Sequence, residues 1–319
     1  MQFRGIARLF AVLAIASQVS LSLSAQDAPV ATFKSGIDLV SVSAVVRDKK
    51  GRVVRALTSK DFVVMDGGTQ RKIIELHADE SAPASVALLV DGSGSMSVGS
   101  ALDSSRHICK LVLTTLDEHR DDAALLSFDT RLLTLRDFTG RFENIRTSLG
   151  DLQAFGQTSL YDAIAGASAV VAQRARNRRA VIVLTDGADT ASSYTPQEVA
   201  WIASTIDVPV YVFAVTQTAA SELAAKEAAK DKEKEGEKPA EPMNPLADLA
   251  RATGGDYFIA GSPALAVNGI IRLVEELRHQ YLIAFEPSTA SGMRQLEIKT
   301  RKNNLRVNAR RWYTSGSQN

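Results

Sequence analysis

Three separated pieces of the sequence together carry the ligands of a metal site. They are Asp91-Gly92-Ser93-Gly94-Ser95, Gly156-Gln157-Thr158-Ser159 and Thr185-Asp186-Gly187. Their small oxygen ligands are Asp91, Ser93, Ser95, Thr158 and Asp186. A hard divalent cation such as Mg²⁺, or Mn²⁺, prefers carboxylate, hydroxyl and water oxygens over nitrogen or sulfur. These side chains leave the ion only partly neutralised, so it can still attract an acidic group from outside.

Three other kinds of site use similar residues, but the spacing of their motifs does not match this sequence. An EF-hand needs glycine and glutamate at the two positions where this chain has Met96 and Leu102. A nucleophile elbow needs glycines two residues before and after Ser93, where the chain has aspartate and serine. A phosphate-binding loop needs a Gly-Lys-Ser/Thr ending, which is missing. A polar turn remains as the alternative for residues 91–95, since Gly, Ser and Asp favour turns. Thr158 and Asp186 stand at the matching places in the order of strands and helices, which weighs against a simple polar turn.

The pattern resembles a known binding site. Asp-x-Ser-x-Ser after an apolar strand, a later Thr, and Thr-Asp-Gly closing a second strand are similar to the metal-ion-dependent adhesion site of von Willebrand factor type A domains. The resemblance covers about residues 85–280. It implies that Ser93, Ser95 and Thr158 bind the ion through their hydroxyls, and Asp91 and Asp186 directly or through water. It also implies that the last coordination position is left for a glutamate or aspartate of the partner.

The surrounding sequence alternates buried strands with amphipathic helices. Residues 86–90 and 181–184 are short apolar runs, which are typical of central parallel strands covered on both faces. The alternation predicts an α/β fold with a doubly wound, mostly parallel sheet and helices on both faces. In such sheets ligands bind beyond the carboxyl ends of the strands. Asp91 and Asp186 stand at or just after such ends, and Thr158 opens a helix that can reach the same edge.

Ser159 is expected to cap the helix over residues 160–175, with Asp162 completing a Ser-x-x-Asp capping pattern. We prefer this structural role for Asp162 to metal ligation. The single cysteine, Cys109, excludes an internal disulfide and is expected to be a buried core residue. The four histidines show no ligand spacing.

Both flanks have a different character. Six strands are expected there, namely residues 37–47, 61–65, 71–77, 281–285, 296–300 and 305–312. That number suits one sheet or sandwich. We therefore expect residues 26–84 and 281–319 to form one smaller β-domain into which the central domain, residues 85–280, is inserted. Residues 57–67 and 281–313 resemble the flanks of bacterial secreted proteins related to von Willebrand factor type A.

The chain of 319 residues has 45% apolar residues and a formal net charge of +1, which gives no reason to expect nucleic acid as a partner. Residues 1–25 resemble a signal peptide, with Arg4 and Arg8 before an apolar stretch that is too short to span a bilayer comfortably. No stable membrane span is expected. Residues 219–242 carry mixed charge and few large apolar residues, which predicts a disordered surface insertion.

These features predict a secreted or periplasmic protein of the adhesion type. It is expected to bind an Asp or Glu of a protein partner through the metal. One alternative is an accessory subunit of an export or assembly complex. The other is a metal-dependent hydrolase, which needs a general base or activated nucleophile near the ion. The three motifs contain no His, Lys or Glu, so we expect no enzyme.

Overall fold

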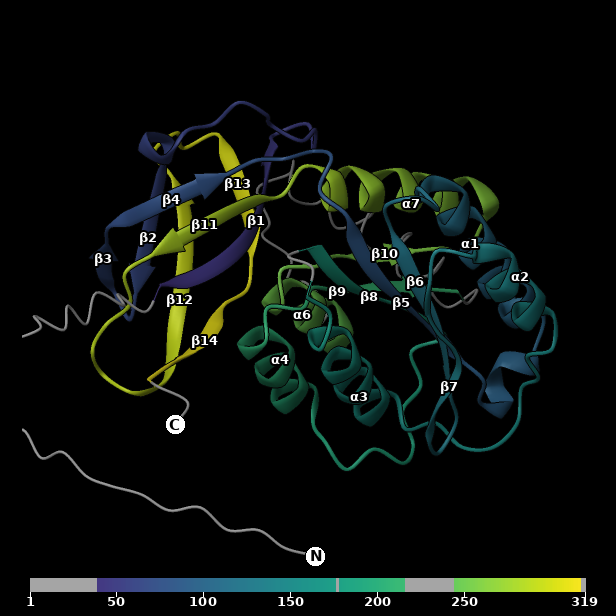
Figure 1. Ribbon diagram of the computed structural model, residues 1–319. Coiled ribbons are helices and arrows are strands. Elements are labelled where there is room, and N and C mark those ends of the chain that lie inside the picture. The colour runs from purple at the N-terminus through teal and green to yellow at the C-terminus, as the bar shows by residue number, and fades with distance from the viewer. Residues whose placement is uncertain (1–38, 176–177, 216–243, 317–319) are drawn as a thin grey trace, which may run out of the picture. The chain divides into compact units, whose positions relative to one another are not determined.

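The computed structural model describes residues 39–175, 178–215 and 244–316, all within the compact unit Asp38–Asn319 (Figure 1). The predicted signal segment, residues 1–25, and the predicted insertion, residues 219–242, lie outside the described residues. In the described part of the chain, no helix is both long enough and apolar enough to cross a membrane.

A six-stranded sheet forms the centre of the fold, as the sequence predicts. The strand order is β10-β9-β8-β5-β6-β7, and only the pairing of β7 with β6 is antiparallel. The strands are β5 (Ala84–Asp91), β6 (Asp122–Phe128), β7 (Leu132–Thr139), β8 (Arg178–Thr185), β9 (Val210–Ala214) and β10 (Tyr257–Ile259). The predicted α/β class with a mostly parallel sheet is confirmed.

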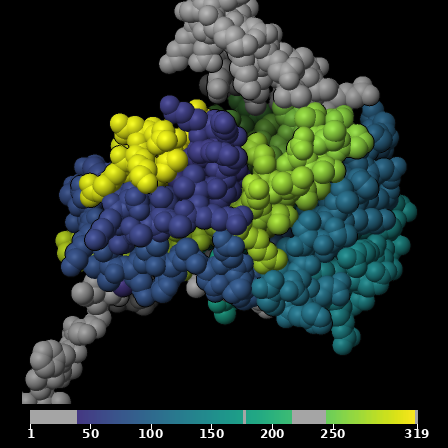
Figure 2. Space-filling model, turned by 90° about the horizontal axis from the view of Figure 1, so that it is seen from above, coloured from purple at the N-terminus to yellow at the C-terminus, as the bar shows by residue number. Residues whose placement is uncertain are grey.

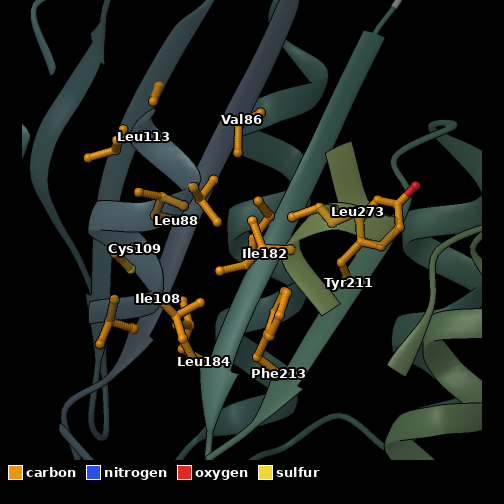
Figure 3. Close-up of a cluster of buried hydrophobic side chains, with 14 of the residues drawn as sticks. Val86, Leu88, Ile108, Cys109, Leu113, Ile182, Leu184, Tyr211, Phe213 and Leu273 are labelled. Atoms are coloured by element: carbon orange, nitrogen blue, oxygen red, sulfur yellow. The ribbon is translucent and has the colours of Figure 1, made fainter. Parts of the chain in front are cut away.

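Helices cover both faces of this sheet, which explains why its central strands are apolar along their whole length. Val86 and Leu88 face a core with α1 (Ala101–Thr115), α2 (Phe142–Gly150) and α7 (Pro263–Arg278) (Figure 3). Ala87 and Leu89 face a second core with α3 (Leu160–Ala172), α4 (Pro196–Thr205) and α6 (Pro245–Ala252). Cys109 is buried in the first core, as expected. The helix α2 was not predicted.

Strands from both ends of the described chain form two further sheets around a shared third core (Figure 1). Figure 2 shows the purple residues of the N-terminal part beside the yellow residues of the C-terminal part. One sheet has the order β13-β1-β11-β4 and the other β14-β12-β2-β3. A short 3-10 turn, η1 (Ser59–Asp61), precedes β2. The strands are β1 (Val40–Asp48), β2 (Phe62–Asp66), β3 (Thr69–Arg71), β4 (Ile73–His77), β11 (Tyr281–Phe285), β12 (Gly292–Thr300), β13 (Leu305–Ala309) and β14 (Trp312–Ser315). The expected joining of both flanks in β-structure is confirmed, while the domain limits at residues 84/85 and 280/281 stay a prediction.

The last predicted strand, residues 305–312, is wrong as a single element. The chain leaves β13 at Ala309 and enters β14, in the other sheet, at Trp312. Between them Arg310 is buried, and its guanidinium lies 3.2 Å from the Asp207 carboxylate. The predicted strand over residues 71–77 is likewise divided, with β3 ending at Arg71 and β4 beginning at Ile73, so the described residues of the flanks form eight strands instead of the predicted six.

Replacing Gly255 by alanine should destabilise the protein by about 2 kcal/mol, because overpacking of this kind typically costs 1–3 kcal/mol. A Cβ there would lie 2.0 Å from the Val210 carbonyl oxygen, on backbone that cannot swing aside. Gly150→Ala is the matched control, since its Cβ would meet nothing within 4 Å. Urea unfolding measures both, and a Gly255→Ala variant as stable as Gly150→Ala would contradict this packing.

Candidate metal centre

The loop after β5 lies tightly against the end of β6. Asp91 is the last residue of β5, and the 3-10 turn η2 (Gly94–Ser97) follows closely. The Gly92 N–H donates to the Phe128 carbonyl oxygen at 2.7 Å. A Cβ on Gly92 would lie 2.9 Å from the Ser127 Oγ, closer than real side chains pack. A larger residue here would have to displace the Ser127 hydroxyl, whereas glycine lets the loop approach the neighbouring strand.

The two loop serines bring their hydroxyls together. Ser93 is buried and Ser95 is exposed, and their Oγ atoms lie 3.1 Å apart. A hydroxyl has two lone pairs, so each serine can bond the other and still offer an oxygen to a cation. Neighbouring ligands of an octahedral Mg²⁺ lie on the order of 3 Å apart, since each is about 2.1 Å from the ion. The spacing of these two hydroxyls fits that geometry.

Asp91 is a fully buried carboxylate held by two loops. One oxygen accepts the Thr185 hydroxyl at 2.6 Å, and the other accepts the Ser93 N–H at 2.9 Å. Burial raises the pKa of Asp91 from 3.8 to about 6, although hydrogen bonds from Ser93 and Thr185 act to lower it, and the negative charge of Asp186 is a smaller contribution to the rise. A bound cation would favour the ionised form of this buried carboxylate.

Thr158 lies in a loop that hydrogen bonds join to both neighbouring loops. On one side the Gly94 N–H donates to the Gly156 carbonyl oxygen at 3.0 Å. On the other side the Thr158 N–H donates to the Thr190 Oγ1 at 3.0 Å, and the Thr190 N–H returns to the Thr158 carbonyl oxygen at 2.9 Å. Thr158 is buried. All three predicted pieces thus meet at the carboxyl edge of the central sheet.

Asp186 directly follows β8 and is partly exposed. One of its carboxylate oxygens accepts the Ala188 N–H at 3.0 Å, which shapes the turn after the strand. The preceding Thr185 hydroxyl accepts the Gly187 N–H at 3.0 Å while donating to Asp91. Thr185 is no predicted ligand. Its hydroxyl joins the Asp91 carboxylate to the backbone of the turn after β8.

Ser159 is the N-cap residue of α3, as predicted, but the predicted side-chain capping by Ser159 and Asp162 is wrong. Ser159 makes no side-chain cap bond. Instead Asp162 accepts the N–H groups of Ser193 and Tyr194 at 2.9–3.0 Å. The first turn of the helix is capped from the loop after β8, where Asp189 accepts the Leu160 N–H at 2.8 Å. Asp162 and Asp189 thus fix one loop against one helix, and capping signals read along the sequence could not reveal partners about 30 positions away.

The five predicted metal ligands offer only oxygen atoms to an ion. In the described ranges, no three His, Cys, Asp or Glu side chains gather to hold a metal ion. A cation at this edge would therefore depend on serine and threonine hydroxyls beside the two aspartates. Such all-oxygen sets favour Mg²⁺ or Mn²⁺ over Zn²⁺, which prefers sulfur and nitrogen.

Residues 86–188 match the von Willebrand factor type A domain family. This stretch contains β5, α1, α3 and β8 and all five predicted ligands. The chain therefore carries a domain of this family, as its motifs predicted. Domains of this family are generally binding or adhesion modules. A comparison with curated proteins gave no match.

Several solved structures are similar to the chain. The protein BatB from Bacteroides thetaiotaomicron is 16% identical, with 60% of this chain and 98% of that chain covered and a TM-score of 0.46. A von Willebrand factor type A protein from Catenulispora acidiphila is 14% identical, with 80% and 74% covered and a TM-score of 0.47. The von Willebrand factor domain of the type V pilus tip protein Mfa5 from Porphyromonas gingivalis is 24% identical, with 34% and 39% covered and a TM-score of 0.31.

Proposed function

We propose that this chain is an exported binding protein that captures an acidic side chain of a protein partner through a divalent metal ion. The ion, Mg²⁺ or Mn²⁺, would be held by Asp91, Ser93, Ser95, Thr158 and Asp186. The observation that carries the proposal is the fully buried Asp91 carboxylate at this loop edge, whose pKa burial raises to about 6. Burial opposes the ionised form of this carboxylate, and a bound cation would favour it.

The bound ion would supply concentrated positive charge at a partly open edge. Ser95 and Asp186 are accessible, whereas Asp91, Ser93 and Thr158 are buried beneath them. The buried side chains can hold the ion from below, and the exposed ones border the side that a partner approaches. A carboxylate is the partner group that best matches a hard cation with incomplete neutralisation.

The alternative functions differ in the group that would approach the bound ion. An accessory subunit of an export or assembly complex would use the same site on a different partner, and adhesion and assembly therefore share this chemistry. A hydrolase would need a base beside the ion. The three motifs contain no His, Lys or Glu, and Asp91, Asp186, Ser93 and Ser95 are hydrogen-bonded to backbone N–H groups or to hydroxyls. These contacts favour binding.

Ser95→Ala should weaken Mg²⁺ and Mn²⁺ binding at least about tenfold, because it removes an accessible hydroxyl ligand without disturbing the core. Ser97→Ala is the matched control, since its equally exposed hydroxyl donates to the Gly94 carbonyl oxygen and is no predicted ligand. Isothermal titration calorimetry measures both affinities. Equal ion affinities in the two variants would contradict the site.

Partner capture is tested with the exported protein fraction in Mg²⁺ or in EDTA. The wild-type chain should retain a partner only in Mg²⁺, and Ser95→Ala should lose it. The same proteins retained in EDTA would argue against capture through a metal.

A further inference from the structure

The loop after β8, residues 186–194, holds the backbone of the candidate ligand Thr158 through hydrogen bonds. The Thr158 N–H donates to the Thr190 Oγ1 at 3.0 Å. The Thr158 carbonyl oxygen accepts the N–H groups of Thr190 and Ala191, both at 2.9 Å. None of these bonds uses the Thr158 hydroxyl. The backbone of Thr158 is therefore fixed, while its side-chain oxygen can still bind a cation.

The same loop caps the helix that begins after Thr158. Asp189 accepts the Leu160 N–H at 2.8 Å and the Ser192 hydroxyl at 2.6 Å. The Ser192 Oγ in turn accepts the Tyr161 N–H at 3.0 Å. A helix leaves its first N–H groups without partners inside the helix, so these two side chains supply acceptors that α3 needs. The loop and the start of α3 therefore form one hydrogen-bonded unit.

Asp186, a second candidate ligand, stands four residues before Thr190 in this loop. Next to it, the Gly187 N–H donates to the Thr185 Oγ1 at 3.0 Å, which fixes the turn to the end of β8. The short segment is thus held at β8 on one side and at Thr158 on the other. The separation of the two ligand positions is therefore set by hydrogen bonds within the chain.

We propose that Thr190 is a positioning residue of the metal site, which holds Thr158 and Asp186 at the separation that Mg²⁺ requires before the ion binds. The inference rests on the proposed function and names a residue that acts through two of the ligands. Mg²⁺ demands nearly ideal octahedral geometry, whereas Ca²⁺ accepts longer and less regular arrangements. A fixed separation of the ligands therefore favours Mg²⁺, and a loosened one favours it less.

Thr190 can be tested apart from the capping of α3. In the described ranges its hydrogen bonds go to Thr158 and none goes to the helix. Thr190 is exposed, so a change of its side chain leaves the cores on both faces of the sheet intact. Thr190→Val keeps the shape and the backbone N–H but removes the hydroxyl. The Thr158 N–H then loses its acceptor, and only the contacts at its carbonyl oxygen remain.

Thr190→Val should lower the Mg²⁺ affinity at least about tenfold, the usual effect of removing a group that orients a metal ligand. The Ca²⁺ affinity should fall at most about threefold, because Ca²⁺ tolerates the altered separation. Isothermal titration calorimetry with the full chain measures both ions. Thr190→Ser keeps the hydroxyl and should restore both affinities to about the wild-type values.

Thr195→Val is the matched control. Thr195 is an exposed threonine that follows the same loop, and its Oγ1 accepts the Glu198 N–H of its own helix, α4, at 3.3 Å. Loss of this cap should lower the temperature of thermal unfolding but leave both ion affinities unchanged. A general loss of stability is thereby separated from a change at the ligands.

Hydrogen exchange in EDTA provides a measurement that needs no ion. The amides of residues 156–162 should exchange about fivefold faster in Thr190→Val than in the wild type, because one hydrogen bond that closes the loop is lost. In Thr195→Val and in Thr190→Ser, the same amides should exchange at about the wild-type rate. Comparison at one pH removes the intrinsic pH dependence of the exchange.

The outcomes distinguish this inference from the proposed function. If the wild type binds Mg²⁺ and Thr190→Val binds it as tightly as Thr195→Val, the positioning role is overturned and the metal site stands. The same holds if Thr190→Val loses affinity for both ions by one factor, if Thr190→Ser does not restore binding, or if exchange in EDTA is equal in all variants. Failure of the wild type to bind Mg²⁺ overturns both proposals.

Discussion

Asp91→Asn should make the metal-free protein more stable by about 2 kcal/mol at pH 8 and abolish its stabilisation by Mg²⁺. Burial raises the pKa of Asp91 from 3.8 to about 6, although hydrogen bonds from Ser93 and Thr185 act to lower it. A shift of this size corresponds to about 3 kcal/mol against the ionised carboxylate. Asparagine keeps the shape and an acceptor oxygen but carries no charge, so most of that penalty disappears.

The sign of the pH dependence follows from the raised pKa. The protonated form of Asp91 stabilises the folded state fully below pH 3.8, and this contribution is lost as the pH rises through about 6. The metal-free wild type should therefore lose stability relative to Asp91→Asn between pH 4 and about 6. Mg²⁺ needs the ionised carboxylate, so its affinity for the wild type should fall below pH 6.

Thermal unfolding from pH 4 to 8, with and without Mg²⁺, measures both effects. Asp162→Asn is the control, because this carboxylate belongs to the same edge but accepts the Ser193 and Tyr194 N–H groups. It should lower stability by about 1 kcal/mol, the typical value of a lost hydrogen bond, and keep the response to Mg²⁺. An Asp91→Asn variant that Mg²⁺ stabilises as strongly as the wild type would show that Asp91 is no ligand.

Arg310→Ala should destabilise the protein by about 3–5 kcal/mol, which is the usual effect of breaking a buried charged pair. The guanidinium donates to the carbonyl oxygens of Ser204, Thr205 and Ser41 at 2.6–3.0 Å and pairs with Asp207. Ser204 and Thr205 end α4, Asp207 follows this helix, and Ser41 belongs to β1. Removal of Arg310 leaves the Asp207 charge and several carbonyl groups without this partner.

Arg311→Ala is the matched control for this variant. Arg311 is the exposed neighbour, and its contact with α6 is a backbone bond from its N–H to the Ala252 carbonyl oxygen at 2.9 Å, which alanine keeps. Its stability should stay within about 0.5 kcal/mol of the wild type. Urea unfolding followed by circular dichroism measures both variants. If Arg310→Ala is as stable as Arg311→Ala, the buried arginine does not join the terminal strands to α4.

The arrangement of the terminal strands could be predicted only in part. Their alternation indicates β-structure, but it does not say which strand pairs with which. β1 lies between β11 and β13, both more than 230 residues later in the chain. Arg310 resembles Arg311 in sequence, and only the nearby Asp207 and the carbonyl groups around it make its burial favourable.

The sequence by itself determined the central sheet and the edge at which the candidate ligands meet. Apolar runs end at Asp91 and just before Thr185-Asp186, and the carboxyl ends of parallel strands share one edge. The tertiary structure decided the rest, namely the raised pKa of Asp91, the role of Thr185 and the pairing of Asp162 with a distant loop. These properties depend on burial and on partners far along the chain, which no local pattern of residues contains.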